Sequence, residues 1–100
     1  PERKVKMQAA LKYAAEVPLK TARLASEALA GLTVCAASVS RQVLSDYRSA
    51  TYLLEAAARC AAENVMINAE SLEDRACAEK LVAEVKSYLP AQPAAQAVSN

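Results

Sequence analysis

The sequence contains no histidine, phenylalanine or tryptophan, and it has a single glycine. Without histidine, the chain cannot supply the imidazole on which Ser-His-Asp and Cys-His mechanisms depend. Its three cysteines, Cys35, Cys60 and Cys77, lie far apart and form no Cys-x-x-Cys pair. This spacing argues against a disulfide framework and against a zinc site, so we expect no bound metal. Any chemistry must come from carboxylates, lysines, tyrosines or thiols.

Charge and hydropathy exclude two further classes of partner. Twelve basic residues nearly balance eleven acidic ones, and no basic cluster is interleaved with aromatic residues. A nucleic-acid partner is therefore not expected. No apolar run approaches the ~20 residues that a membrane-spanning helix needs, and no signal peptide is visible. The sequence predicts a cytoplasmic protein without a membrane partner.

Alanine dominates what remains of the composition. Apolar residues make up 54% of the chain, but about a quarter of all residues are alanine, which buries little area and is the best helix former. No segment alternates apolar and polar residues for long enough to form a strand. We expect an all-α fold, an antiparallel bundle of about four helices. Because large apolar side chains are few, we expect it to be part of a larger helical domain that buries area between chains.

The helix boundaries follow from prolines and capping residues. The predicted helices cover residues 2–16, 19–37, 46–67 and 72–89. Pro18 lacks a backbone donor, so a kink or break is expected there. Ser45 is expected to cap the third helix, and the Ser71–Asp74 segment approximates a capping box before the fourth. Residues 90–100 have little to bury and are predicted to be a flexible tail.

The third helix carries the unusual residues. Steps of three and four from Asp46 trace a seam that we expect to face inward, along Asp46, Ala50, Leu54, Ala57, Ala61, Asn64 and Asn68. Asparagine is a poor helix former, so Asn64 and Asn68 need partners: either neighbouring backbone or a polar ligand. Asp46 is likewise either a partner of the helix dipole or a site residue. Asp46 and Asn68 are roughly 33 Å apart along a helix, so only an antiparallel partner would bring them together.

Three stretches carry a resemblance to a known family. They are residues 2–19, which include Gln-Ala-Ala-Leu and Val-Pro-Leu, the Ser45-Asp46 pair, and the Asn64-Val-Met-Ile-Asn68 motif. In order and spacing these stretches resemble the cyclodeaminase domain of formiminotransferase-cyclodeaminase and its stand-alone relatives, which include methenyltetrahydrofolate cyclohydrolases. One departure is Val39-Ser40, where the family commonly has Gly-Asn, and this puts the loop geometry and full activity in doubt.

The resemblance implies a dimeric helical domain of about twice this length, of which residues 1–89 would be the C-terminal half. It implies a tetrahydrofolate derivative as substrate and a homodimer, or a missing N-terminal half, as partner. Ser45, Asp46, Asn64 and Asn68 are then the expected substrate-binding residues. The catalytic residues stay unassigned, because the family's proposed catalytic aspartate is expected to lie outside this chain.

Two functions of different classes remain open. One is a folate enzyme, either formiminotetrahydrofolate cyclodeaminase or methenyltetrahydrofolate cyclohydrolase. The other is a helical dimerisation or scaffold module without catalytic activity, which the alanine seams and Val39-Ser40 favour. Saturable folate binding would separate the two.

Overall fold

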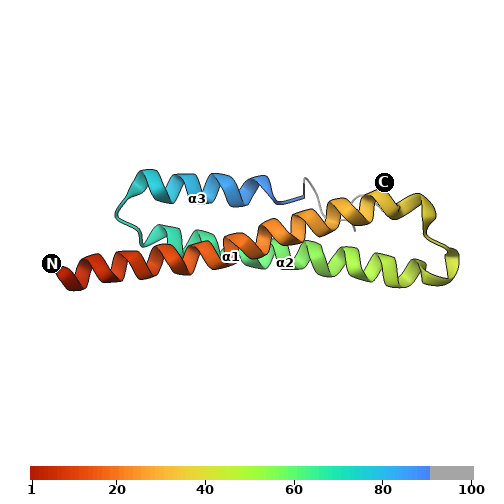
Figure 1. Ribbon diagram of the computed structural model, residues 1–100, viewed down its shortest axis with the longest axis horizontal. Coiled ribbons are helices and arrows are strands. Elements are labelled where there is room, and N and C mark those ends of the chain that lie inside the picture. Colours follow the sequence, from red (N-terminus) through yellow and green to blue (C-terminus); the bar gives the residue numbers. More distant parts are fainter. Residues whose placement is uncertain (91–100) are drawn as a thin grey trace.

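The computed structural model describes residues 1–90, which form three α-helices and two short 3-10 turns. The helices are α1, Glu2–Cys35, α2, Leu44–Glu70, and α3, Arg75–Ser87, and the turns Ala36–Ser38 and Arg41–Val43 join α1 to α2. α1 and α2 form a long antiparallel hairpin, and α3 lies along only part of it (Figure 1). The principal dimensions are 60 × 22 × 16 Å. The all-α prediction is confirmed, with three helices in place of four.

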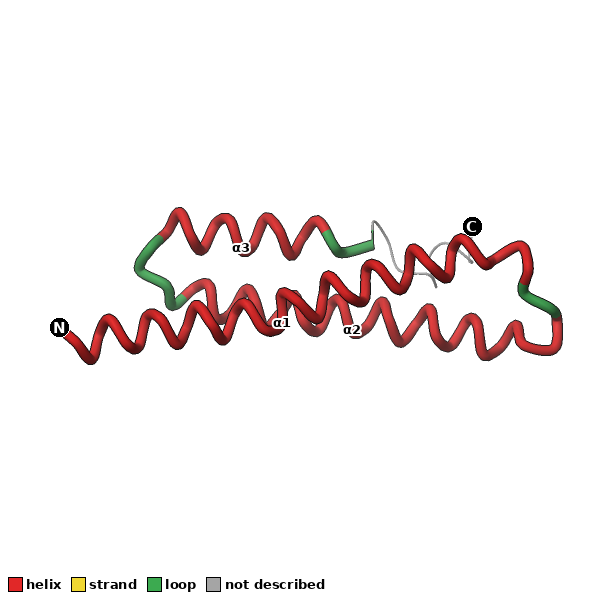
Figure 2. Tube along the Cα trace, in the orientation of Figure 1, coloured by secondary structure: helices red, strands yellow, loops and turns green. Residues whose placement is uncertain are grey.

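Pro18 does not break the first helix, so the prediction of separate helices over 2–16 and 19–37 was wrong. α1 runs through Pro18 as one helix of 34 residues (Figure 2). In an α-helix, the missing N–H of residue 18 would bond the carbonyl of residue 14. Asn68 Nδ2 on α2 donates to that Ala14 carbonyl at 3.2 Å. A second helix therefore supplies the donor that proline lacks.

The core between the helices consists mostly of alanine. Its buried members share small size, with Val65 and Val85 the largest side chains that are fully buried. They are Ala15, Ala22, Ala61, Ala62, Val65, Ala69, Leu72, Ala78, Leu81 and Val85. Small side chains let helix axes approach closely, but each alanine contributes little apolar area. The fold therefore has a thin core for its length.

The predicted inward seam of α2 is rotated relative to the buried stripe. Of the seam from Asp46 to Asn68 only Ala61 is buried, and both Asp46 and Asn64 are exposed. α2 instead buries Ala58, Ala62 and Val65. The reason is that α3 packs against one flank of α2, and the residues on that flank are therefore buried.

The helix caps also differ from expectation. α2 begins at Leu44 with Val43 as its N-cap and no side-chain capping bond, so Ser45 lies inside the first turn and is not the cap. Asp46 does lie in that first turn, as predicted. α3 is capped by Asp74, whose Oδ1 accepts from the Cys77 N–H at 3.1 Å. Ser71 ends α2 rather than starting α3, so the capping box was placed too early.

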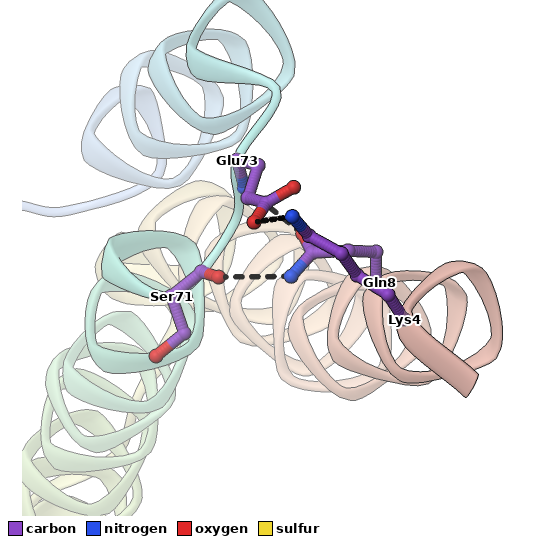
Figure 3. A network of polar contacts seen from close by, with 4 residues as sticks. All are labelled: Lys4, Gln8, Ser71 and Glu73. Carbon is purple, nitrogen blue, oxygen red and sulfur yellow. Dashed lines mark hydrogen bonds and ion pairs between the residues drawn. The ribbon is translucent and has the colours of Figure 1, made fainter. Parts of the chain in front are cut away.

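A small polar cluster fastens the start of α1 to the turn between α2 and α3 (Figure 3). Gln8 Nε2 donates to the Ser71 carbonyl at 3.4 Å, and Gln8 Oε1 accepts from the Glu73 N–H at 2.9 Å. Lys4 Nζ lies 3.1 Å from Glu73 Oε1, with both side chains more than half exposed. An exposed ion pair contributes roughly 0–1 kcal/mol, so Gln8 is the more specific contact.

The described chain ends against α2. The Pro90 carbonyl accepts from Arg59 Nη2 at 3.4 Å. Beyond Pro90, the predicted flexible tail lies outside the described residues.

The cap at Asp74 gives a test of this fold. Asp74→Ala should lower the free energy of unfolding by about 1 kcal/mol, because the Cys77 N–H loses its acceptor at the start of α3. Urea denaturation followed by far-UV circular dichroism measures the change. Glu73→Ala is the matched control, since it removes only an exposed ion pair and leaves the Glu73 N–H bonded to Gln8. Equal losses for the two variants would contradict the assignment of Asp74 as the cap.

Candidate functional site

The four predicted site residues lie at opposite ends of α2. Ser45 and Asp46 begin the helix, next to the end of α1, where Tyr47 Oη donates to the Leu32 carbonyl at 2.9 Å. Asn64 and Asn68 lie near its other end, where Asn68 bonds the Ala14 carbonyl of α1. Asp46 and Asn68 are separated by roughly 33 Å of helix. Within one chain, the structure does not bring the two pairs together.

Three of these residues nevertheless share one side of the hairpin. At 3.6 residues per turn, Asp46 and Asn64 project from the flank of α2 turned away from α3, and Asn68 lies at its inner edge beside α1. We call the exposed surface on this side the open face. On α2 it comprises Asp46, Ser49, Leu53, Ala56, Cys60, Asn64 and Ile67, all exposed. On α1 it comprises Tyr13, Val17, Thr21, Leu24, Ala28, Gly31 and Cys35, also exposed.

The open face is mostly apolar or small. Leu53 is 71% exposed, Tyr13 69% and Ile67 59%. On α2 its polar residues lie toward the two ends of the helix, with Asp46 near one end and Asn64 near the other. Contiguous exposed apolar surface marks an interaction site more often than chance exposure does. The candidate site residues therefore lie on a surface suited to covering by another helical layer.

Asn68 already has a structural role. Its Nδ2 donates to the Ala14 carbonyl at 3.2 Å and to the Asn64 carbonyl at 3.0 Å. Pro18 leaves the Ala14 carbonyl without its helical donor, so this amide completes the bonding of α1. This is the first of the two alternatives that the sequence left open, a bond to neighbouring backbone. The Asn64 side chain, by contrast, is exposed and makes no hydrogen bond within residues 1–90.

Sequence reasoning missed a groove on the other side of α1. It has a volume of about 490 Å³, and α1 and α3 line it with Lys12, Glu16, Cys77, Lys80 and Glu84 among others. A Lys-Glu pair at i,i+4 spacing on each helix is the signal that could have located it. Acidic and basic groups are mixed along the groove, so it presents no single charge to a ligand.

Near this groove, the end of α3 carries a perturbed tyrosine. Tyr88 Oη donates to Glu84 Oε2 at 2.9 Å. This hydrogen bond to a carboxylate raises the pKa of Tyr88, because losing the proton would place two negative charges side by side. The pair lies at the end of α3, away from the open face.

Two kinds of site are absent from the described residues. No group of three or more His, Cys, Asp or Glu side chains within residues 1–90 could hold a metal ion. In the same part of the chain, no helix combines the length and hydropathy needed to cross a bilayer.

The fold and the open face define a helical domain with one side left for further helices. The sequence matches the formiminotransferase-cyclodeaminase family over residues 1–87. The chain belongs to this family. It is 38% identical over 87 residues to a methenyltetrahydrofolate cyclohydrolase from Methylorubrum extorquens, a match that covers 87% of this chain and 42% of that protein. The chain thus spans less than half the length of this relative. No solved structure matches it.

The bond across Pro18 gives a test of the role of Asn68. Asn68→Ala should lower the free energy of unfolding by roughly 1 kcal/mol, because the Ala14 carbonyl loses its donor. In a Pro18→Ala background the loss should be smaller, since the alanine introduced at position 18 would donate its own N–H to the Ala14 carbonyl. Urea denaturation of the four proteins of this double-mutant cycle measures the coupling.

Asn64→Ala is the matched control for the cycle. It removes an exposed amide on the same helix and should change stability little in either background. A loss for Asn68→Ala that is the same with and without Pro18 would contradict the compensating role.

Proposed function

We propose that this chain is part of a folate-dependent one-carbon enzyme, with methenyltetrahydrofolate cyclohydrolase or formiminotetrahydrofolate cyclodeaminase activity. The observation that carries the proposal is the family match over residues 1–87, together with the 38% identity to a cyclohydrolase. The two reactions are close alternatives. One opens methenyltetrahydrofolate with water, and the other closes 5-formiminotetrahydrofolate to the methenyl form and releases ammonia.

The residues of the open face suit this chemistry. Both reactions pass through a tetrahedral carbon between two nitrogens, and both need protons moved to and from that centre. Asp46 is an exposed carboxylate in the first turn of α2. Asn64 offers an exposed amide that can donate to and accept from a pterin ring. We propose Ser45, Asp46, Asn64 and Asn68 as substrate-binding residues, with Asn68 also keeping its role of holding α1.

The proposed site needs a further chain or segment. The relative is more than twice as long as the matched region, and the two polar ends of α2 are too far apart for one ligand. We propose that a second copy of the chain, in a homodimer, or the segments that the relative has beyond the match, complete it. The catalytic groups are proposed to include residues outside those described.

A helical dimerisation or scaffold module is the second candidate. Two observations favour it. Val39 and Ser40, where the family commonly has Gly-Asn, lie in the link between the two 3-10 turns. The Asn68 amide is also engaged in holding α1 rather than left for a ligand. A scaffold would keep the alanine-rich helix packing and lose the pterin contacts.

Folate binding separates these functions. Titration of the full-length protein with 5,10-methenyltetrahydrofolate, followed by its absorbance, should saturate for an enzyme. The absorbance of that substrate then follows cyclohydrolase turnover, and ammonia release from 5-formiminotetrahydrofolate follows the cyclodeaminase. A titration without a saturable signal would support the scaffold instead.

Asn64→Ala should weaken binding or turnover by about tenfold or more, equivalent to ~1.4 kcal/mol from a lost amide contact. Its urea unfolding curve should stay close to that of the unmodified protein, because the side chain is exposed. Glu63→Ala is the control, since it removes the exposed neighbour of Asn64 on another flank of α2 and should keep full activity. Equal loss of stability and turnover in Asn64→Ala would assign Asn64 to the fold and not to the site.

A further inference from the structure

Both hydrogens of the Asn68 side-chain amide are used inside the protein. Nδ2 donates to the Ala14 carbonyl at 3.2 Å and to the Asn64 carbonyl at 3.0 Å. The nitrogen of a primary amide has two hydrogens to donate and accepts no hydrogen bond. Nδ2 is therefore fully bonded, and it has no hydrogen left for a ligand.

The oxygen of the same amide is free. Within residues 1–90, Oδ1 of Asn68 accepts no hydrogen bond. Asn68 is half-buried, yet no buried side-chain oxygen in this part of the chain lacks a partner, so Oδ1 must be accessible to solvent. An amide oxygen has two lone pairs and only accepts. Asn68 thus presents an acceptor, and no donor, to its surroundings.

Pro18 fixes this orientation of the amide. A half-turn of the amide would place Oδ1 against the carbonyl oxygens of Ala14 and Asn64, so that acceptors would face acceptors. The Ala14 carbonyl would then have no donor at all, because the N–H that would bond it in an ordinary helix is missing at Pro18. The amide is held in one of its two orientations. Asn64, whose side chain makes no hydrogen bond within residues 1–90, has no such constraint.

The exposed side chains next to this bond are apolar. Tyr13 precedes Ala14 and Val17 follows it by about one turn, and Ile67 precedes Asn68. Their exposed fractions are 69% for Tyr13, 50% for Val17 and 59% for Ile67. A fixed polar group among apolar side chains is typical of a site for a small organic ligand. A tetrahydropterin ring fits this pattern, since it has apolar faces and carries N–H donors at N3 and at its 2-amino group.

We propose that Asn68 binds the folate substrate through Oδ1 alone, by accepting a hydrogen bond from an N–H of the pterin ring. Pro18 is then a positioning residue, because it keeps Nδ2 on the Ala14 carbonyl and leaves the oxygen for the ligand. The inference rests on the proposed function, which supplies the pterin. It assigns both roles of Asn68 to one amide at the same time, so the ligand binds without releasing α1.

NMR of the full-length protein tests which atom of Asn68 meets the ligand. The protein is saturated with 5,10-methenyltetrahydrofolate, or with the equilibrium mixture where the protein turns this folate over. The scalar coupling from the Asn68 side-chain amide to the Ala14 carbonyl should persist, and the Asn68 Cγ resonance should move downfield as Oδ1 accepts its bond. Loss of the coupling on binding would show that Nδ2 is released to the ligand and would overturn the inference. A Cγ resonance that does not move would overturn it too.

Substitutions at position 68 give a second readout. They are made in a Pro18→Ala background, where the N–H of residue 18 bonds the Ala14 carbonyl and the fold no longer needs the amide. Asn68→Asp keeps an acceptor oxygen and should raise the dissociation constant of 5,10-methenyltetrahydrofolate by about threefold at most. Asn68→Leu has a similar size and no acceptor, and it should raise this constant by about tenfold or more.

The charge of the new carboxylate needs its own control, because the methenyl group is cationic. Ile67→Asp combined with Asn68→Leu, in the same background, adds a carboxylate one residue away without an acceptor at position 68. It should bind as weakly as Asn68→Leu alone. Urea denaturation checks that these proteins are as stable as the Pro18→Ala protein.

These outcomes are separate from the test of the proposed function. Equal weakening by Asn68→Asp and Asn68→Leu, in proteins that still bind and turn over the folate, rejects the acceptor role and leaves the enzyme standing. An unmodified protein without a saturable titration rejects the folate function, and with it the ligand assigned to Asn68.

Discussion

One hydrogen bond between the two long helices joins the backbone of α1 to a side chain of α2 at the point where proline interrupts α1. Pro18 interrupts the bonding of α1 at the Ala14 carbonyl, and Asn68 Nδ2 on α2 reaches across to that carbonyl at 3.2 Å. A proline leaves a helical carbonyl without its donor, and this contact pairs that carbonyl within the continuous α1. It also places α2 against α1 in one register, because the amide reaches only one carbonyl of that helix. The proline and the asparagine, fifty residues apart in the chain, act as one structural device.

The continuous α1 has a consequence for packing. Because α1 is continuous, alanines from two long helices meet along the hairpin, and α3 covers one side of part of it. The other side keeps an exposed surface in which apolar and small residues prevail and polar groups lie at the ends. This surface carries Asp46 and Asn64, so the placement of the candidate site follows from the same contact that holds the hairpin. The proposed function belongs to the surface that the hairpin leaves open.

Much of the helical fold could be predicted from sequence, and the errors have identifiable physical causes. Composition and the absence of strand patterns were sufficient for the all-α class, and Asp46 was placed correctly in a first helical turn. The break at Pro18 was predicted from a local rule, and it failed because the compensating donor comes from a residue distant in sequence. The predicted inward seam of α2 is rotated from the stripe that is buried, because the sequence of α2 alone does not show which flank α3 covers. Ser71 was predicted to be a cap where Asp74, three residues later, has the geometry.

The candidate site was only partly accessible to sequence reasoning. Asn64 and Asn68 stood out as polar residues in an alanine-rich helix, but their different roles emerged only from the geometry. Asn68 bonds backbone, whereas Asn64 is exposed on the open face. Ser45 and Asp46 were correctly expected to be distant from the asparagines within one chain. Another chain or segment would have to bring the two pairs of residues together. The sequence of a single chain does not show how such a chain or segment packs.

The most direct measurement of the central contact is an NMR scalar coupling through the hydrogen bond from the Asn68 side-chain amide to the Ala14 carbonyl. The account predicts a detectable coupling, slow exchange of the Asn68 amide protons with solvent, and helical chemical shifts through Pro18. Rapid exchange of those protons, no coupling to Ala14 and an interruption of helical shifts at Pro18 would contradict it.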